Sequence, residues 1–107
     1  MSIGSGRGEH EIGLTKEGID IRLSDINAGV IDNTQRLFSD IKITQLDILD
    51  ETSTTNCLDS GPYDVIFVPS LFYMLDDEQS VAAIKNMRKL VADNGILCLS
   101  FRSRDTW

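Results

Sequence analysis

The sequence has little cysteine, proline or positive charge. Its two cysteines, Cys57 and Cys98, are far apart, and Cys98 lies in the apolar run 96–99, so we expect two reduced thiols and neither a disulfide nor a metal site. Ten basic residues stand against 17 acidic ones, which gives a net charge of −7. Because phosphate backbones are bound by clustered Lys and Arg, this composition excludes nucleic acid as a partner held by charge.

Long hydrophobic runs are also missing. No apolar segment approaches the roughly 20 residues that span a bilayer, and the first residues do not resemble a secretory signal. We therefore expect a cytoplasmic protein with no membrane partner. The 107 residues, of which 41% are hydrophobic, predict one domain with a small core.

A glycine-rich segment is the most informative feature that is present. Gly4, Gly6 and Gly8 follow a short apolar start and precede a helix-competent stretch. Residues 19–23 then alternate like a strand and lead to Asp25. A strand, a glycine turn, a helix and a second strand form the first half of a nucleotide-type site. Here Gly4 would permit the tight turn, Gly6 the close approach of a ligand, and Gly8 the close packing of the helix.

Helical and strand-like patterns alternate along the rest of the chain. A helix is expected after Asp25 or Asn27, with an apolar face formed by Val30, Ile31, Thr34, Leu37 and Phe38. A strand over 41–46 ends at Asp47, and the polar residues 50–61 form a loop or at most a short helix. The continuous hydrophobicity of 63–68 predicts a strand that is covered on both faces.

The last two elements complete the alternation. Asp76 or Asp77 caps a helix that is expected to stop in a left-handed turn at Asn94 and Gly95, and a final strand covers 96–101. Strands and helices in this order predict an α/β fold: a doubly wound, mostly parallel five-stranded sheet with helices on both faces.

Candidate ligand-binding residues fall at the carboxyl ends of the predicted strands, where such sheets bind ligands. Asp25 could accept hydrogen bonds from two ribose hydroxyls, and Asp47 from an exocyclic amine of a purine. Ile26 and Ile48, one residue further on, could hold the ring between them. Each residue also has a structural interpretation, as a packing turn, a helix cap or a solvated side chain.

These residues resemble a known family. The segment 4–8, Asp25, Asp47 and the block 63–68, together with the turn at 90–97, are similar to the class I S-adenosylmethionine-dependent methyltransferases, which have a Rossmann-like fold. The resemblance implies S-adenosyl-L-methionine as the cofactor. The residues that it implies for cofactor binding are Gly4, Ser5, Gly6, Gly8, Asp25, Ile26, Asp47, Ile48 and Pro69.

Two departures from the family pattern stand out. Ser2 occupies the position, two residues before the first glycine, where the family usually has an acid, and Asn94 replaces the usual Gly or Pro before Gly95. The main alternative within the fold, a nicotinamide or flavin dinucleotide site, requires a third glycine at position 9, which is Glu9. A carboxylate there would also face the pyrophosphate. The positive sulfonium of the methyl donor is compatible with nearby acids.

Methyl transfer from a sulfonium needs mainly positioning, so no strong catalytic constellation is expected and none is identified. The loop after strand 63–68 is expected beside the acceptor, with Ser70, Phe72 and Tyr73 as acceptor-side residues. It lacks the motifs of nucleobase methylation, which together with the acidic charge favours a small-molecule methyl acceptor. A base role for His10 is conceivable, although a solvated or capping histidine fits its helix position as well.

The resemblance also implies an incomplete domain. Family members add an antiparallel hairpin after the fifth strand, whereas here the sequence stops at Trp107 and begins three residues before Gly4. We therefore expect 1–107 to be one partial domain, truncated at both ends. A non-catalytic or half-site fragment that needs a partner chain is the alternative to a working enzyme. The apolar strand 96–101 would form a sheet edge through which the chain could self-associate.

Overall fold

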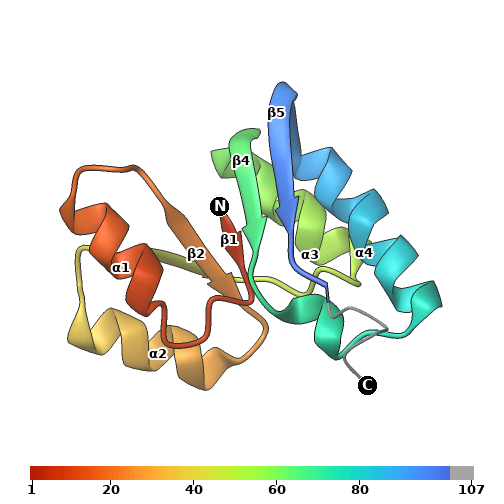
Figure 1. Cartoon of the computed structure of the whole chain (residues 1–107). Helices are drawn as coiled ribbons and strands as arrows, with labels where there is room; N and C mark the ends of the chain where they lie inside the picture. Colours follow the sequence, from red (N-terminus) through yellow and green to blue (C-terminus); the bar gives the residue numbers. More distant parts are fainter. Residues whose placement is uncertain (102–107) are drawn as a thin grey trace.

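A central parallel sheet organises the molecule. The computed structural model describes residues 1–101 (Figure 1). The strands are β1 (Ser2–Ile3), β2 (Arg22–Asp25), β3 (Lys42–Gln45), β4 (Tyr63–Val68) and β5 (Val91–Leu99). They pair in the order β3-β2-β1-β4-β5, and all four pairings are parallel. The predicted five-stranded α/β sheet is confirmed, with β1 at its centre; Trp107 lies outside the described residues.

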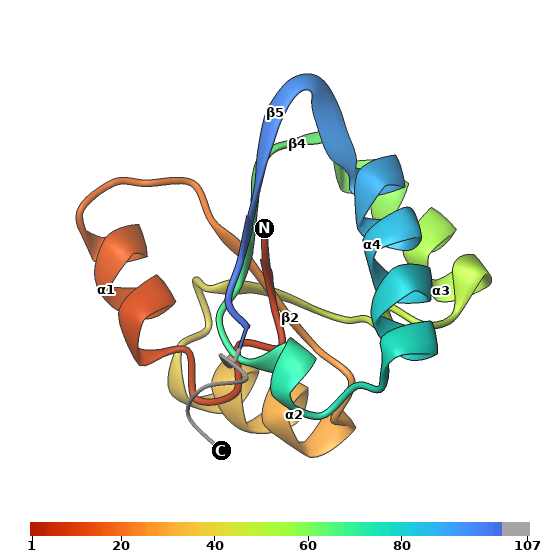
Figure 2. The same cartoon turned by 45° about the vertical axis from the view of Figure 1, so that its right-hand side comes forward.

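Helices cover both faces of the sheet, as predicted. Helices α1 (Glu9–Lys16) and α2 (Ala28–Leu37) lie on one side, and α3 (Glu51–Asn56) and α4 (Asp77–Leu90) on the other (Figure 2). Two 3₁₀ turns, η1 (Cys57–Ser60) and η2 (Leu71–Tyr73), precede and follow β4. The chain winds outward from β1 to β3 and then crosses to β4, so the strand order reverses between β1 and β4. That is the place where doubly wound sheets bind ligands.

Two apolar cores hold these layers together. The larger one lies between the sheet and α3 and α4, and its fully buried residues include Ile66, Val68, Met87 and Leu90. The smaller one lies under α1 and α2 and consists of Ile12, Leu23, Ile41 and Ile43. Full burial of such a side chain stabilises the fold by about 1.5–3 kcal/mol. The larger core therefore fixes β4 and β5 against α4.

One prediction about β4 is wrong. Ile66 and Val68 are fully buried, but Val65 and Phe67, which point to the opposite face, are 47% and 39% exposed. Helix α1 lies on that side but does not extend across β4 (Figure 2). Among residues 1–101, β4 is therefore covered on only one of its two apolar faces.

Several element boundaries also differ from expectation. Strand β2 begins at Arg22, and Ile19 is exposed in the preceding loop. Leu37, expected on the apolar face of α2, is the last residue of the helix and is 60% exposed. The predicted cap of α4 is confirmed: Asp76 forms a capping box with Gln79.

The predicted left-handed stop at Asn94 and Gly95 is wrong. Helix α4 ends at Leu90, and Gly95 lies inside β5 without a positive φ. Glycine is needed there for space, since a Cβ would lie 2.6 Å from Val91 Cγ2 and 2.8 Å from the carbonyl oxygen of Asp64. Close approach of the irregularly paired ends of β4 and β5 therefore explains this glycine.

Candidate functional site

The glycine loop leaves β1 at the carboxyl edge of the sheet. Gly4, Gly6 and Gly8 have φ values of 72°, 56° and 66°, which are left-handed conformations that glycine adopts without steric cost. The main-chain N–H groups of Gly4 and Ser5 both donate to the carbonyl oxygen of Ser24, each at 2.9 Å. The loop is therefore fixed to β2 from its first residue.

Gly8 lets α1 pack closely on the sheet, as predicted. A Cβ at this position would lie 2.5 Å from Leu23 Cδ2, and Leu23 is fully buried. By contrast, a Cβ at Gly6 would meet no atom within 4 Å. The space over Gly6 is open, so main-chain atoms of the loop are accessible to a ligand there.

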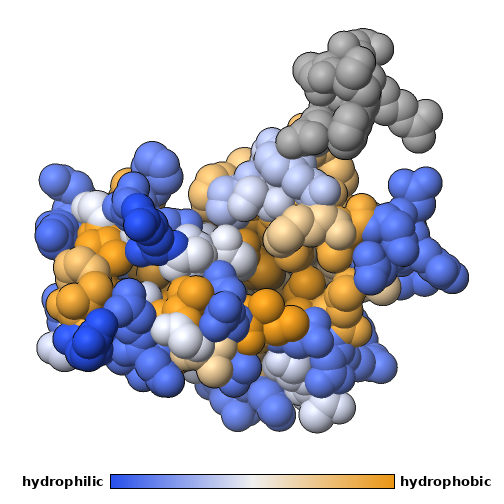
Figure 3. All heavy atoms as spheres, turned by 90° about the horizontal axis from the view of Figure 1, so that it is seen from below, coloured by the Kyte–Doolittle hydropathy of each residue, from blue (hydrophilic) through white to orange (hydrophobic). Residues whose placement is uncertain are grey.

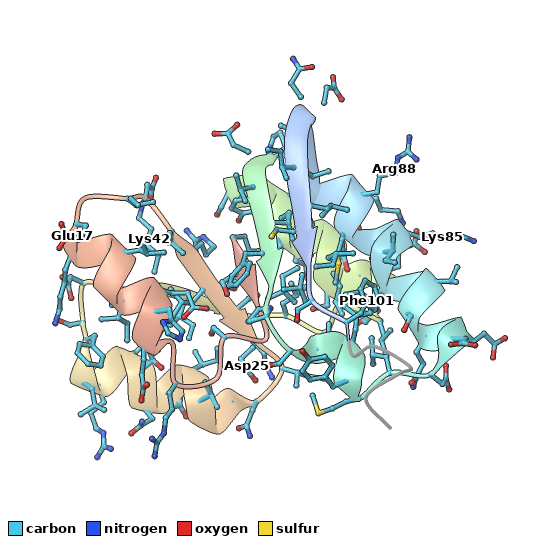
Figure 4. All side chains as sticks on the ribbon, in the orientation of Figure 1. Glu17, Asp25, Lys42, Lys85, Arg88 and Phe101 are labelled. Atoms are coloured by element: carbon cyan, nitrogen blue, oxygen red, sulfur yellow. The ribbon has the colours of Figure 1, made fainter. Side chains whose placement is uncertain are left out.

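Asp25, the last residue of β2, is tied to this loop. Its Oδ2 accepts a hydrogen bond from the Gly6 N–H at 2.9 Å, and its Oδ1 accepts one from the Asn27 N–H at 3.0 Å. The side chain is half-buried at the carboxyl edge of the sheet (Figure 4). Each carboxylate oxygen retains a further lone pair, so Asp25 can accept hydrogen bonds from a ligand as well.

Ser5 supplies an unsatisfied polar atom in the same loop. Its Oγ is buried and has no hydrogen-bond partner within residues 1–101. Buried polar atoms are nearly always paired, so an orphan of this kind calls for a partner other than residues 1–101. A ligand with a polar group against the glycine loop would provide one.

Asp47 and its neighbours lie at the end of β3, beside the end of β2. The Leu46 N–H donates to the carbonyl oxygen of Asp25 at 3.0 Å, which joins the two strand ends. Asp47 is half-buried; its Oδ1 accepts from the Leu49 N–H at 3.0 Å, and its own N–H donates to Ser53 Oγ at 3.0 Å. The carboxylate thus caps a turn, while its second oxygen is available to a ligand.

The two isoleucines that were expected to enclose a ring have different surroundings. Ile26 is 59% exposed next to Asp25, whereas Ile48 is only 4% exposed. The side chain of Ile48 belongs to the larger core, and its carbonyl oxygen accepts from Asn86 Nδ2 at 2.7 Å. The expected sandwich is therefore corrected: Ile26 offers a free apolar surface, but Ile48 fills the core.

The segment after β4 lies across the switch point from the glycine loop. Pro69 and Ser70 follow β4 directly, and a Cβ on Gly4 would contact Leu71 Cβ at 3.9 Å. Phe72 is buried, with its ring centroid 4.5 Å from that of Phe101. The predicted acceptor-side residues thus divide into Phe72, which supports the segment from within, and Ser70 and Tyr73 nearer the surface.

Tyr73 connects this segment to the end of β5. Its hydroxyl lies 3.0 Å from Ser100 Oγ, and its side chain is exposed. Ser100 also donates its N–H to the Val68 carbonyl oxygen at 3.2 Å. The sequence did not single out Ser100, because its position beside Tyr73 depends on the pairing of β4 with β5.

Comparison with known proteins agrees with this geometry. A family model described as a methyltransferase domain matches residues 1–95. The chain belongs to the methyltransferase domain family. The resemblance seen in the sequence is thereby confirmed. A comparison with curated protein sequences finds no match.

Solved structures of methyltransferases share this fold. DesVI of Streptomyces venezuelae superposes with a TM-score of 0.77 at 17% identity, over 99% of this chain and 44% of that one. The sugar N-methyltransferase KedS8 of a Streptoalloteichus species superposes with a TM-score of 0.75 at 20% identity, over 99% of this chain and 42% of that one. A SAM-dependent methyltransferase of Archaeoglobus fulgidus superposes with a TM-score of 0.66 at 21% identity, over 90% of this chain and 41% of that one. The chain spans less than half the length of each.

Ser2, at the position where the sequence pattern of the family has an acid, is hydrogen-bonded to a carboxylate from α1. Ser2 Oγ donates to Glu11 Oε1 at 2.7 Å, and both residues are buried. Glu11 comes from α1, so a carboxylate reaches the end of β1 from the helix and not from the strand. This pair could not be predicted from the sequence, because a glutamate in the first turns of a helix is usually solvated.

The methyltransferase fold presents its carboxyl edge as a mixed surface. Figure 3 views this edge and shows apolar side chains between hydrophilic regions. Ile26 and Met74 are among the exposed apolar residues that follow these strand ends. In the described part of the chain, no group of His, Cys, Asp or Glu could hold a metal ion. None of its helices has the length and apolar character needed to cross a membrane.

Two hollows lie beside this edge and not across it. One, of about 560 Å³, lies between α1 and α2 and is lined by Gly6, Glu9 and Asn33 among others. The larger, of about 730 Å³, lies towards the amino ends of the strands, where Ser2, Arg22 and Val65 contribute to its wall.

Proposed function

We propose that this chain binds S-adenosyl-L-methionine and serves methyl transfer to a small-molecule acceptor. The observation that carries the proposal is the direct bond between the glycine loop and Asp25, at the carboxyl ends of β1 and β2 and next to the point where the strand order reverses. Membership of the methyltransferase domain family supports it. One solved relative is named a sugar N-methyltransferase, and another, DhpI, is in a complex with SAM.

Each part of the cofactor has a group that would hold it. The open main chain at Gly6 and the orphan Ser5 hydroxyl would hold the methionine end. Asp25 would accept from the ribose hydroxyls, Asp47 from the adenine amine, and Ile26 would cover one face of the ring. Carboxylates near the site suit a cofactor whose sulfur is positively charged.

When bound, the cofactor supplies a methyl group that is already activated on a sulfonium. The protein's part is then to align the acceptor with the methyl–sulfur bond. Pro69, Ser70 and Tyr73 lie on the side of the switch point where the acceptor would enter. A side chain that removes a proton is needed only for an acceptor that must lose one.

Calorimetry with S-adenosyl-L-methionine and S-adenosyl-L-homocysteine tests binding, with NAD as the comparison ligand. We expect both sulfur ligands to bind and NAD not to bind, because Glu9 places a carboxylate where a pyrophosphate would lie. A folded protein that binds neither sulfur ligand would overturn the proposal. Methyl transfer to amino and hydroxyl sugars is then assayed separately. Binding without turnover would favour a half-site that needs a partner chain and would count against transfer to these sugars.

A further inference from the structure

One apolar face of the sheet has no cover. In the parallel register Val65 is paired with Ile96, and Phe67 with Cys98, so these four side chains point to the same side. Ile96 is 62% exposed, and Cys98 is exposed as well. We name this set of four residues the β4–β5 face. Figure 2 shows α3 and α4 on the other side of β4 and β5, and no helix of residues 1–101 over this one.

The β4–β5 face continues into the hollow next to α1. Leu14 and Ile19, both exposed, line this hollow of about 730 Å³ together with Val65 and Phe67. A contiguous exposed apolar surface usually marks an interaction site, whereas single exposed apolar residues are common and carry no such meaning. Strands of a parallel sheet are moreover usually buried on both faces.

The outer edge of β5 is also free. In the described chain β5 pairs with β4 alone, which leaves a row of main-chain N–H and C=O groups without strand partners. Such edges favour association with another chain. Ile96 and Cys98 belong to this edge strand and to the β4–β5 face. The unpaired main-chain edge and the uncovered apolar face therefore meet at β5.

We propose that a second copy of the chain packs on the β4–β5 face around a two-fold axis parallel to the strands. Helix α1 stands about one layer, roughly 10 Å, above the sheet, and the uncovered face is two strands, about 10 Å, wide. Helix α1 and the lower β4–β5 face beside it therefore form a step, and the same step on a second copy would fit against it. After the rotation, the two β4–β5 faces pack on each other, and α1 of each copy lies beside the β5 edge of the other.

This arrangement covers the face and the edge with one isologous contact. The contact would bury five apolar side chains that are each 39% or more exposed in the single chain: Leu14, Ile19, Val65, Phe67 and Ile96. At the rim of the hollow Lys42 is already paired with Asp20 of the same chain at 2.9 Å, so the contact between the copies is mainly apolar. A single foreign helix would cover the face but leave the edge exposed.

Sedimentation equilibrium of the whole chain tests the proposal. We expect a mass twice that of the 11.9 kDa chain. Because each copy has a net charge of −7 and the contact is apolar, added salt should strengthen the dimer by screening repulsion. A monomer at all concentrations up to millimolar would overturn the proposal, and so would a dimer that salt dissociates.

A pair of matched variants locates the contact. Ile96→Glu places a charge on the β4–β5 face and should weaken the dimer at least 100-fold. Val81→Glu makes the same kind of change at a residue of α4 that is 54% exposed, and should leave the dimer intact. Circular dichroism verifies that both variants fold. If Ile96→Glu dimerises like the wild type, the contact is not where we place it.

Cys98 gives an independent readout, since Cys57 is buried. In the proposed dimer the two Cys98 thiols face each other across the axis, so a short bis-maleimide should link two chains, and Cys98→Ser should abolish the product. A dimer of the right mass that gives no Cys98 cross-link would contradict the face-to-face arrangement and indicate pairing through the β5 edge alone.

Discussion

The main-chain N–H of Gly6 donates a 2.9 Å hydrogen bond to Oδ2 of Asp25. Gly6 is the glycine of the loop with the most open space above it, and Asp25 is the acid at the end of β2. Asp25 therefore orients the loop in addition to presenting a carboxylate to a ligand. Loop geometry and ligand recognition depend on the same side chain.

We predict that Asp25→Asn lowers the affinity for S-adenosyl-L-methionine by about 10–100-fold. The amide oxygen can still accept from Gly6, so the loop should keep its conformation, although the amide nitrogen cannot accept from the Asn27 N–H as Oδ1 does. Hydrogen bonds from the ligand lose a charged acceptor, and bonds of that kind are worth about 1.5–3 kcal/mol. Calorimetry measures the dissociation constant, and the amide resonance of Gly6 reports the loop.

Asp32→Asn is the matched control for this change. Asp32 is exposed on α2, and its substitution removes the same charge without touching the loop. It should leave the affinity within about twofold of the wild type, as expected for a distant surface charge. Equal affinities for Asp25→Asn and the wild type would exclude Asp25 from the cofactor site.

Local patterns were sufficient to predict much of the fold. The capping residue Asp76, the strand Tyr63–Val68 and the turn at Gly4 are each determined by neighbours in sequence, and the structure confirms them. Asp25 was identified for the same reason, since it follows a strand. Its bond to Gly6 is a consequence of the pairing of β1 with β2.

Features that depend on distant parts of the chain were missed. The burial of Ile48 follows from the packing of α4, and the Glu11–Ser2 pair from the position of α1 over β1. The exposure of Val65 reflects the absence of a covering element within residues 1–101, and the hydrophobicity of a strand cannot reveal that. In each case the residue type indicates a preference, while the neighbour that decides the outcome comes from another element.

The buried Ser2–Glu11 pair predicts a measurable effect on stability. Ser2→Ala removes the hydroxyl that donates to the Glu11 carboxylate, and Glu11 is only 5% exposed. The free energy of unfolding should therefore fall by about 1–3 kcal/mol. Adding Glu11→Gln removes the buried charge and should recover part of this loss. Urea denaturation of Ser2→Ala, Glu11→Gln, the double variant and the exposed Ser39→Ala control measures the effect. Strictly additive changes would mean that the two side chains do not interact.

Two glycines of the α1 region should respond to alanine with opposite signs. Gly8→Ala introduces a Cβ 2.5 Å from Leu23 Cδ2 at a φ of 66°, so left-handed strain of about 1–2 kcal/mol adds to the cost of overpacking. Gly13 lies inside α1 with open space around it, so Gly13→Ala should stabilise the protein by about 0.5–1 kcal/mol. Chemical denaturation gives both values. Destabilisation by Gly13→Ala would show that α1 is packed more tightly than in this structure.

Cys57 and Tyr63 predict a loss of stability at alkaline pH. Burial raises the pKa of the Cys57 thiol above its ordinary value of 9.0, and burial likewise raises the pKa of the Tyr63 hydroxyl above 10.0. The two groups are close, since the hydroxyl donates to the Cys57 carbonyl oxygen at 3.4 Å. In the unfolded chain each proton is lost near its ordinary pKa, whereas the folded state retains it to higher pH. Stability from these groups is therefore complete below about pH 9 and falls as the pH rises through the folded pKa values.

The urea midpoint at about pH 8.5 and about pH 10.5 measures this loss. Over this range the Met1 amino group, whose pKa burial lowers from 8.0, is largely deprotonated in both states and contributes little. Cys57→Ala should be less stable at both pH values because it leaves a cavity, but its loss between them should be smaller than that of the wild type. Cys98→Ala, which changes an exposed thiol, should retain the full difference. If Cys57→Ala and Cys98→Ala lose the same stability, the alkaline transition arises from groups other than the buried thiol.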